Sequence, residues 1–394
     1  MSELIQRKAA ALLQKLTGQY PVITVTGPRQ SGKTTLCRKV FGEFGYANLE
    51  APDTREFALE DPRGFLWKLG REAVLDEFQN APDLVSYLQE IVDDPNFRGQ
   101  YILTGSSDLT LRGTVNQSLA GRTALISLLP LSYEELSSAG IDSGIDGLIL
   151  SGFYPRIHAQ DLDPSMALAS YVGTYLERDV RTAASIGDLT AFQRLLGLCA
   201  GRVGQLLNLT GLGNDAGLSH TTVGRWLSLL EAGYVLFRLP PFHSNVGKRL
   251  IKSPKLYFYD VGLASWLIGI RTPDQVPMHP LRGMLFESLI ITEVMKHLEN
   301  RGIQAPLSFY RDSNGNEIDL VIRWGNSIML IEIKSSMTVR SEMLKGLFRF
   351  PRKVKGSITR VLVHAGEEER TQSGVLVTGL PGLKSLLNGF LEKS

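Results

Sequence analysis

One segment of the sequence has the residue types and spacing of a phosphate-binding loop. The pattern Gly-x-x-x-x-Gly-Lys-Ser/Thr is satisfied, between a β-branched run and helix-forming residues, by Gly27, Pro28, Arg29, Gln30, Ser31, Gly32, Lys33 and Thr34, with Thr35 following. In such a loop the backbone N–H groups bind phosphate oxygens, the lysine reaches the outer phosphates, and the hydroxyl ligates Mg²⁺. The segment therefore predicts a site for ATP and Mg²⁺.

The carboxylates that such a site needs follow a short apolar strand predicted at 73–75. We expect Asp76 to hold the Mg²⁺ shell and Glu77 to orient and activate the attacking water. A second buried strand, predicted at 101–103, ends at Thr104, which we expect to sense the γ-phosphate or the water. A plain turn after a core strand would have the same appearance. Together these residues predict that ATP is hydrolysed and not only bound.

An arginine that could act on a neighbouring subunit also lies close to this region. Arg122 comes just before a further strand, predicted at 125–129. In ring-forming ATPases an arginine near this point projects into the neighbour's site and stabilises the charge of the transition state. A surface or lid arginine would fit the spacing equally well. The first interpretation predicts a homo-oligomer, a ring such as a hexamer.

A second group of ionisable residues lies far downstream in apolar strands. Asp319 is in one strand, and Glu332 and Lys334 are two residues apart in the next, so the last two point to the same side. Two close carboxylates favour a shared divalent cation. Asp…Glu-x-Lys is typical of the metal sites of restriction-endonuclease-like nucleases, and Glu287 in a predicted upstream helix is a further candidate ligand. Edge strands that deter aggregation, and scaffolds that have lost their chemistry, have the same pattern.

The middle of the chain has the outline of a winged helix-turn-helix. Ser219 is a suitable cap for a helix predicted over 221–232, and extended segments around a Lys/Arg-bearing loop follow it. This outline predicts DNA contacts from the helix and phosphate contacts from the loop, made by Thr221, Thr222, Arg225, Lys248, Arg249 and Lys252. Protein-interaction and oligomerisation modules have the same outline.

The composition is that of a soluble globular protein. The 394 residues are 43% apolar and 21% charged, and the length predicts two or three domains. The two cysteines have no paired spacing, and no apolar run suits a signal peptide or a bilayer span, so we expect a cytoplasmic protein without membrane contact. Residues 43–94 hold thirteen acids and four bases, whereas residues 340–360 hold seven bases and one acid. This asymmetry favours a C-terminal half that faces a polyanion, with a solvated basic face as the alternative.

The order of the motifs resembles that of one prokaryotic family. The motifs are GPRQSGKTTL, VLDEFQ, ILTGSS and SLAGR, followed by GFYPR, YLERDV and SPKLYFYDVGLASWL, and the resemblance runs from Gln19 to Ser336. Members of that family have an AAA-type ATPase domain followed by a domain of uncharacterised function with a restriction-endonuclease-like core. The resemblance implies ATP hydrolysis, assigns Thr104 to sensing and makes Arg122 the arginine finger.

We therefore expect an α/β fold with three domains. These are a P-loop AAA-type ATPase core with a helical lid over residues 1–185, a winged-helix middle domain over 186–272, and a restriction-endonuclease-like α/β domain over 273–394. The expected function is ATP hydrolysis coupled to DNA binding or remodelling, with Mg²⁺-dependent cleavage of DNA as an optional second activity. The competing hypothesis is a nucleotide-gated protein-interaction switch whose nuclease-like domain is catalytically inactive.

Overall fold

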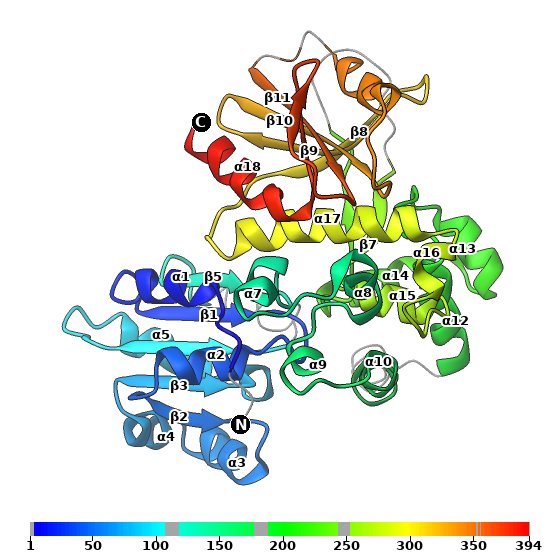
Figure 1. Cartoon of the computed structure of the whole chain (residues 1–394). Coiled ribbons are helices and arrows are strands. Elements are labelled where there is room, and N and C mark those ends of the chain that lie inside the picture. The colour runs from blue at the N-terminus through cyan, green and yellow to red at the C-terminus, as the bar shows by residue number, and fades with distance from the viewer. Residues whose placement is uncertain are drawn as a thin grey trace.

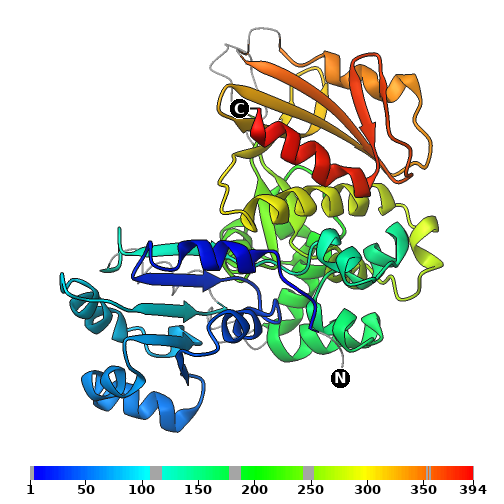
Figure 2. The same cartoon turned by 60° about the vertical axis from the view of Figure 1, so that its left-hand side comes forward.

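The computed structural model describes residues 4–106, 118–176, 188–242, 253–351, 354 and 356–393. The chain forms an N-terminal parallel sheet, a helical middle and a C-terminal mixed sheet (Figure 1). The long helix α17 (Arg282–Glu299) lies between the C-terminal sheet and the helices α8 (Gly144–Ser151) and α15 (Val261–Leu267). The N-terminal and C-terminal sheets lie on opposite sides of α17 in both views (Figure 1, Figure 2).

The N-terminal sheet has the strand order β2-β3-β4-β1-β5, and each neighbouring pair is parallel. Because side chains alternate along a strand, its residues enter two separate cores. Val22 and Leu75 belong to one core, and Ile23 and Val74 belong to the other. The strands are β1 (Val22–Thr26), β2 (Gly45–Asn48), β3 (Glu72–Asp76), β4 (Gln100–Thr104) and β5 (Thr123–Ser127).

Helices cover both faces of this sheet, as the sequence predicts. Buried residues of α1 (Ala9–Leu16) and α2 (Lys33–Val40) complete the core on one face. Those of α3 (Pro52–Glu60), α4 (Pro62–Leu69) and α5 (Leu84–Val92) complete the core on the other face. The result is an α/β layer whose strands present their carboxyl ends at one edge, where ligands of such sheets bind.

The middle of the chain consists of short helices followed by a two-stranded sheet. The antiparallel pair β6 (Leu236–Leu239) and β7 (Lys255–Phe258) follows the helices. The helices before it are α7 (Tyr133–Ser138), α8, α9 (Pro155–Ala159), α10 (Pro164–Tyr171) with a π-helical turn over 172–176, α12 (Leu189–Ala200), α13 (Leu209–Ala216) and α14 (His220–Ala232). The helix α15 and the short α16 (Gln275–Met278) connect this part to α17.

One expectation for this region was wrong. The sequence favours a single helix over 191–208, but α12 ends at Ala200 and α13 begins only at Leu209. The break has a local cause, because the Asn208 side chain accepts a hydrogen bond from the Gly211 N–H at 2.9 Å and starts a new helix there. The helix predicted over 221–232 is present as α14, and Ser219 caps it by accepting from the Thr222 N–H at 3.1 Å.

The C-terminal sheet has the order β12-β13-β11-β10-β9-β8. Its first three strands pair antiparallel in sequence order, and the pairs β10–β11 and β11–β13 are parallel. The strands are β8 (Leu307–Arg311), β9 (Glu317–Trp324), β10 (Ser327–Lys334), β11 (Ser357–His364), β12 (Arg370–Gln372) and β13 (Val375–Thr378). The 3-10 segment η3 (Ser341–Phe348) follows β10, and α18 (Leu380–Glu392) ends the described chain.

The middle of the chain and the C-terminal sheet share one core. A single cluster of buried apolar residues extends from Leu131 to Phe390 and includes side chains from α8, α12, α14, α15, α17 and α18. The chain after β6 also pairs with the edge strand β8, because Phe242 N–H donates to the Phe309 carbonyl at 2.6 Å and Phe309 N–H to that of Pro240 at 3.0 Å. Within the described residues, no helix has the length and apolarity to cross a bilayer.

Candidate functional site

The phosphate-binding loop connects β1 to α2 and lies against the end of β5. Gly27 has a φ of 144°, and a Cβ there would lie 2.2 Å from the carbonyl oxygen of Leu128. Gly32 has a φ of 89° and precedes the first residue of α2. Both positions need glycine because side chains with a Cβ rarely adopt this backbone and the first has no room for one. The strand, loop and helix predicted around the motif are therefore all present.

The Lys33 side chain is buried and folds back onto the loop. Its Nζ donates to the carbonyl oxygens of Gly27 at 3.0 Å and Pro28 at 2.8 Å. Burial lowers the pKa of Lys33 to about 8, while the nearby carboxylates of Glu77 and Asp76 oppose that shift. Because its partners are neutral carbonyls, the ammonium gains by turning to the charged oxygens of a bound nucleotide.

Asp76, at the end of β3, is the centre of the polar contacts at this edge of the sheet. Thr34 Oγ1 donates to its two carboxylate oxygens at 2.9 and 3.1 Å. The hydroxyls of Tyr46 (2.9 Å) and Thr104 also donate to this carboxylate. A threonine hydroxyl and a carboxylate are hard oxygen donors of the kind that Mg²⁺ prefers, so Thr34 and Asp76 fit the ion that the motif implies. Sequence reasoning missed Tyr46, which no motif marks.

A cavity of about 800 Å³ lies beside the loop. Its walls come from the loop and α2, from the N-terminal segment 4–14, from Glu77, and from Pro155 and Arg156 of α9. Glu77 has a left-handed backbone with a φ of 54°, and its carboxylate accepts a hydrogen bond from the Gln79 amide. The predicted loop residues and Glu77 therefore border one open space that can hold a nucleotide.

Arg7 is a member of this site that the sequence did not reveal. Its side chain is 8% exposed, and Nη1 donates to the Ser31 carbonyl at 2.5 Å while Nη2 donates to that of Leu129 at 2.6 Å. Its Nε lies 3.1 Å from Oε1 of Glu135 in α7. The Ser-x-x-Glu pattern of residues 132–135 could have revealed the start of α7, but nothing local marks Arg7 as its partner.

Arg122 lies at the opposite edge of the N-terminal sheet from the loop. It precedes the first residue of β5, whereas the loop follows the last residue of the parallel strand β1. Its guanidinium forms a two-point ion pair with Asp93. The arginine therefore does not reach the nucleotide site of its own subunit, and its role in a neighbouring subunit stays a prediction.

The residues predicted to contact DNA lie at the start of α14 and in the segment after β6. Thr221 and Arg225 are exposed, and Thr222 is half-buried because it takes part in the Ser219 cap. Lys248, Arg249 and Lys252 lie outside the described residues.

Tyr234, just after α14, connects this region to the phosphate-binding loop. It has a left-handed backbone with a φ of 56°, and its hydroxyl lies 2.8 Å from Oγ1 of Thr26, the residue directly before Gly27. The same hydroxyl lies 3.4 Å from Oγ of Ser127. Sequence reasoning missed this residue, which is 208 positions away from its partner.

The C-terminal sheet brings three of the predicted nuclease residues together. Lys334 Nζ lies 2.6 Å from Oε1 of Glu332 and 4.0 Å from Oδ2 of Asp319. Asp319 Oδ2 also accepts from the Ile333 N–H at 2.8 Å. The hairpin of β9 and β10 and the alternation of its side chains were predicted, and both are present.

Glu287, the fourth predicted residue, has partners from the middle of the chain. Lys255 Nζ of β7 lies 3.0 Å from its Oε1, and the Tyr257 hydroxyl donates to the same oxygen at 2.5 Å. Lys255 Nζ also lies 2.5 Å from Oε1 of Glu317. Across the described part of the chain, no three His, Cys, Asp or Glu side chains are arranged to hold a metal ion. The metal role of this cluster therefore stays a prediction.

Burial dominates the electrostatics of this cluster. It raises the pKa of Glu287 and of Glu332 to about 7, and the neighbouring charge of Asp319 adds to both shifts. Burial also raises the pKa of Asp319 itself, against the opposing effect of Lys334 and Lys255. The carboxylates thus gain protons more readily than exposed ones, and they depend on the two lysines for their charged form.

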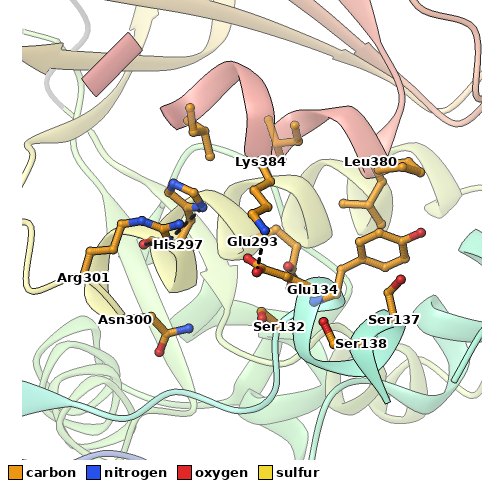
Figure 3. Close-up of a pocket in the computed structure, with 14 residues that line it drawn as sticks. Ser132, Glu134, Ser137, Ser138, Glu293, His297, Asn300, Arg301, Leu380 and Lys384 are labelled. Atoms are coloured by element: carbon orange, nitrogen blue, oxygen red, sulfur yellow. Dashed lines mark hydrogen bonds and ion pairs between the residues drawn. The ribbon is translucent and has the colours of Figure 1, made fainter. Parts of the chain in front are cut away.

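A second cavity, of about 290 Å³, marks the contact between α7, α17 and α18 (Figure 3). Figure 3 shows Lys384 of α18 directed at Glu134 of α7, at 2.6 Å, and Lys8 lies 2.6 Å from the same carboxylate. The Tyr133 N–H donates to Oε2 of Glu293 in α17 at 2.8 Å. The helix that holds Arg7 through Glu135 is therefore also held by the two C-terminal helices.

Three segments of the chain match described protein families. Residues 19–137 match the family described as an AAA domain, residues 143–274 a domain of unknown function (DUF8612), and residues 282–383 a second domain of unknown function (DUF4143). Among solved structures, a Walker-type ATPase of Pyrococcus abyssi has a TM-score of 0.43 at 14% identity, over 67% of this chain and 96% of that one.

The relatives are uncharacterized proteins of bacteria and archaea. Two of them, from Mycobacterium bovis and Mycobacterium tuberculosis, are each 32% identical over 339 residues, which are 85% of this chain and 75% of theirs. One from Methanocaldococcus jannaschii is 21% identical over 343 residues, covering 78% of this chain and 73% of that one. The chain therefore belongs to the family of these two mycobacterial proteins, and its N-terminal part is a P-loop AAA ATPase domain.

Proposed function

We propose that the protein hydrolyses ATP with Mg²⁺ and that hydrolysis is coupled to DNA binding or remodelling by the middle and C-terminal domains. In this proposal Lys33 binds the outer phosphates, Thr34 and Asp76 hold Mg²⁺, and Glu77 orients and deprotonates the attacking water. The metal supplies charge to the phosphate oxygens as the bond to the γ-phosphate breaks. Thr104, hydrogen-bonded to Asp76, keeps that carboxylate turned to the ion.

The contact of Tyr234 with Thr26 carries the proposed coupling. Tyr234 directly follows α14 and one glycine, and its hydroxyl lies 2.8 Å from the hydroxyl of the residue before the phosphate-binding loop. A change of α14 on DNA therefore has a direct route to the loop, and a change of the loop on ATP binding has the same route back. The two hydroxyls share one hydrogen bond, so the coupling can be cut by removing a single oxygen atom.

In this proposal α14 provides the DNA-binding face. Arg225 is exposed and forms no ion pair with any described residue, and Thr221 is exposed on the same helix. Three helices followed by an antiparallel pair make the arrangement of a winged helix-turn-helix, in which the second helix of the pair enters the major groove. Lys248, Arg249 and Lys252 would then contact phosphates from the loop between β6 and β7, so affinity should fall with salt.

The proposal includes a homo-oligomeric ring such as a hexamer. Arg122 lies away from the nucleotide site of its own chain, and a neighbouring subunit could place it near that chain's γ-phosphate. An arginine supplied in this way stabilises the charge of the transition state. Turnover would then depend on protein concentration, and the Asp93 ion pair would have to open when the subunits associate.

The test is ATP turnover with and without single-stranded, duplex and branched DNA. Lys33→Ala and Glu77→Gln should abolish turnover, and one form of DNA should raise that of the wild type. Tyr234→Phe should keep basal turnover and lose the stimulation. Tyr101→Phe is the matched control, because it also removes one interior hydroxyl, which donates to the Gly70 carbonyl at 3.2 Å, but at the start of β4. Normal stimulation in Tyr234→Phe would refute the route.

The competing function is a nucleotide-gated protein-interaction switch with an inactive nuclease-like domain. The observation in its favour is the burial of the C-terminal carboxylates, since Asp319 and Glu332 are each 8% exposed and both lie near Lys334. A scissile phosphate has little access to such a site. If no DNA changes turnover or melting temperature, this function replaces the first. Nicking of DNA with Mg²⁺ that Asp319→Ala abolishes would instead establish the optional nuclease activity.

A further inference from the structure

We infer that the C-terminal carboxylate cluster carries its cation within the chain, with Lys255 of β7 taking the position that a divalent ion would need. The inference concerns a residue that no motif marks, and it goes beyond the proposed ATPase function without depending on it. It identifies what the cluster does in the fold, which is to bind the middle of the chain to the C-terminal domain.

Lys255 reaches the cluster from another part of the molecule. Its side chain is 3% exposed, and Nζ lies 3.0 Å from Glu287 of α17 and 2.5 Å from Glu317 of β9. An ammonium group has three donors and no acceptor, so it can serve two carboxylates at once, as a metal ion does. The lysine therefore bridges acids from two elements of the C-terminal domain.

Each of these two acids is also satisfied by a second donor. The Tyr257 hydroxyl donates to Glu287 Oε1 at 2.5 Å, and Arg311 Nη1 lies 3.1 Å from Oε2 of Glu317. Tyr257 is on the same strand as Lys255, so β7 alone supplies both partners of Glu287. A buried carboxylate with such partners has little reason to turn toward a metal ion, since that would leave a buried lysine without its counter-charge.

The remaining acids do not form a metal site by themselves. Glu332 uses Oε1 for Lys334, and Asp319 uses Oδ2 for the Ile333 N–H, which leaves Glu332 Oε2 as a buried oxygen without a partner. Mg²⁺ needs about six ligands at about 2.1 Å in near-octahedral geometry. One free oxygen of Glu332 falls far short of this, and the arrangement disagrees with the metal that the nuclease-like pattern implies.

The consequence is that β7 and the C-terminal domain move as one body. The Lys255 contacts act together with the backbone bonds between Phe242 and Phe309, at 2.6 Å, and Phe309 and Pro240, at 3.0 Å. A buried ion pair is strongly destabilised when one partner is removed, so this joint resists separation. Force or motion from the ATPase domain would reach both parts together.

The experiment measures Mn²⁺ binding to the full chain by electron paramagnetic resonance, without nucleotide. Asp76→Asn is the parent, because it removes the carboxylate at the ATPase metal position. We expect no Mn²⁺ site in the parent and one new site in the parent with Lys255→Ala. Mn²⁺ should raise the melting temperature of Lys255→Ala by several degrees and leave that of the parent unchanged. Adding Asp319→Asn to Lys255→Ala should abolish both effects.

Lys296→Ala in the same parent is the matched control. Lys296 is 1% exposed and lies 2.8 Å from Glu293 Oε1, so it is an equally buried lysine with a carboxylate partner, but only one. It should lower the melting temperature without creating a Mn²⁺ site. A gain in both variants, or in neither, overturns the inference.

The parent protein alone also decides the question if Lys255→Ala does not fold. A Mn²⁺ site in the parent that Asp319→Asn abolishes would mean that the cluster takes a metal with Lys255 in place, and the inference would then be wrong. No Mn²⁺ site in the parent, together with a Lys255→Gln variant that folds and gains one, supports it. Neither ATP turnover nor DNA enters these measurements, so their outcome is separate from that of the proposed function.

Discussion

Replacement of Arg7 tests whether the N-terminal segment holds the phosphate-binding loop. In Arg7→Ala the Glu135 carboxylate, which is 1% exposed, loses its charged partner but keeps the N–H donors of Lys8 at 2.6 Å and Ser132 at 2.8 Å. Breaking a buried pair typically costs about 3 to 5 kcal/mol, and the two remaining donors favour the lower end, about 3 kcal/mol. At about 2 to 4 °C per kcal/mol the melting temperature should fall by about 6 to 12 °C.

Arg7→Ala should also weaken nucleotide binding, because the Ser31 carbonyl loses a donor at 2.5 Å. One lost charge-assisted hydrogen bond, about 1.5 kcal/mol, corresponds to about a tenfold rise in the dissociation constant. Arg7→Lys should restore part of the stability, since it keeps the charge near Glu135, but a lysine cannot reach both carbonyls from that position. The assays are thermal unfolding and titration with a fluorescent ATP analogue.

A double-mutant cycle with Glu135→Gln separates the two effects. The pair of changes should cost much less stability than the sum of the single changes, because no buried charge is left alone. Nucleotide affinity should stay low in the double variant, since the Ser31 carbonyl still lacks its donor. Lys15→Ala, an exposed cation at the end of α1, is the control and should change neither quantity. If Arg7→Ala binds the analogue as tightly as the wild type, the assignment of Arg7 to the loop is wrong.

Two further predictions concern charged groups of the ATPase domain. The pKa of Lys33 is lowered to about 8 without nucleotide, and phosphates should raise it again, so affinity should be constant below that pH and fall above it, by about eightfold between pH 7.5 and pH 9. A flat profile in a titration with labelled nucleotide would contradict this role. Arg122→Ala removes only an exposed pair with Asp93, so the melting temperature should stay within about one degree. Its kcat should fall, and mixing with excess Glu77→Gln subunits, which keep Arg122, should restore turnover; no fall in kcat would exclude the finger.

Local patterns in the sequence predicted the parts of the site that lie close together along the chain. The loop from Gly27 to Thr34 follows from one motif, and the parallel strands that end at Asp76 and Thr104 follow from apolar runs bounded by polar residues. Since carboxyl ends of parallel strands share an edge, the meeting of Thr34, Asp76 and Thr104 was predictable. The hairpin with Asp319 could be predicted in the same way, because the period of a strand fixes which side chains share a face.

The long-range partners could not be predicted, for a physical reason. Arg7 and Glu135 are separated by 128 positions, and Tyr234 and Thr26 by 208. Periodicity and spacing report which face a residue occupies, but the identity of a distant partner depends on how whole elements pack. Lys255 is the clearest case, because β7 reads as a plain apolar strand until α17 is placed beside it. One carboxylate pattern therefore predicted a metal, while the fold supplies a lysine.

The phosphate-binding loop is held at both ends by parts of the chain outside the ATPase sheet. Tyr234 contacts Thr26 at one end, and Arg7 contacts the Ser31 carbonyl near the other, five positions along. When phosphates draw Lys33 away from the carbonyls of Gly27 and Pro28, the backbone between these two contacts must adjust. Because each contact is a single short hydrogen bond to a rigid element, an adjustment of a few tenths of an ångström is enough to change it. Coupling between ATP and the rest of the molecule thus needs no extended pathway, only these two bonds.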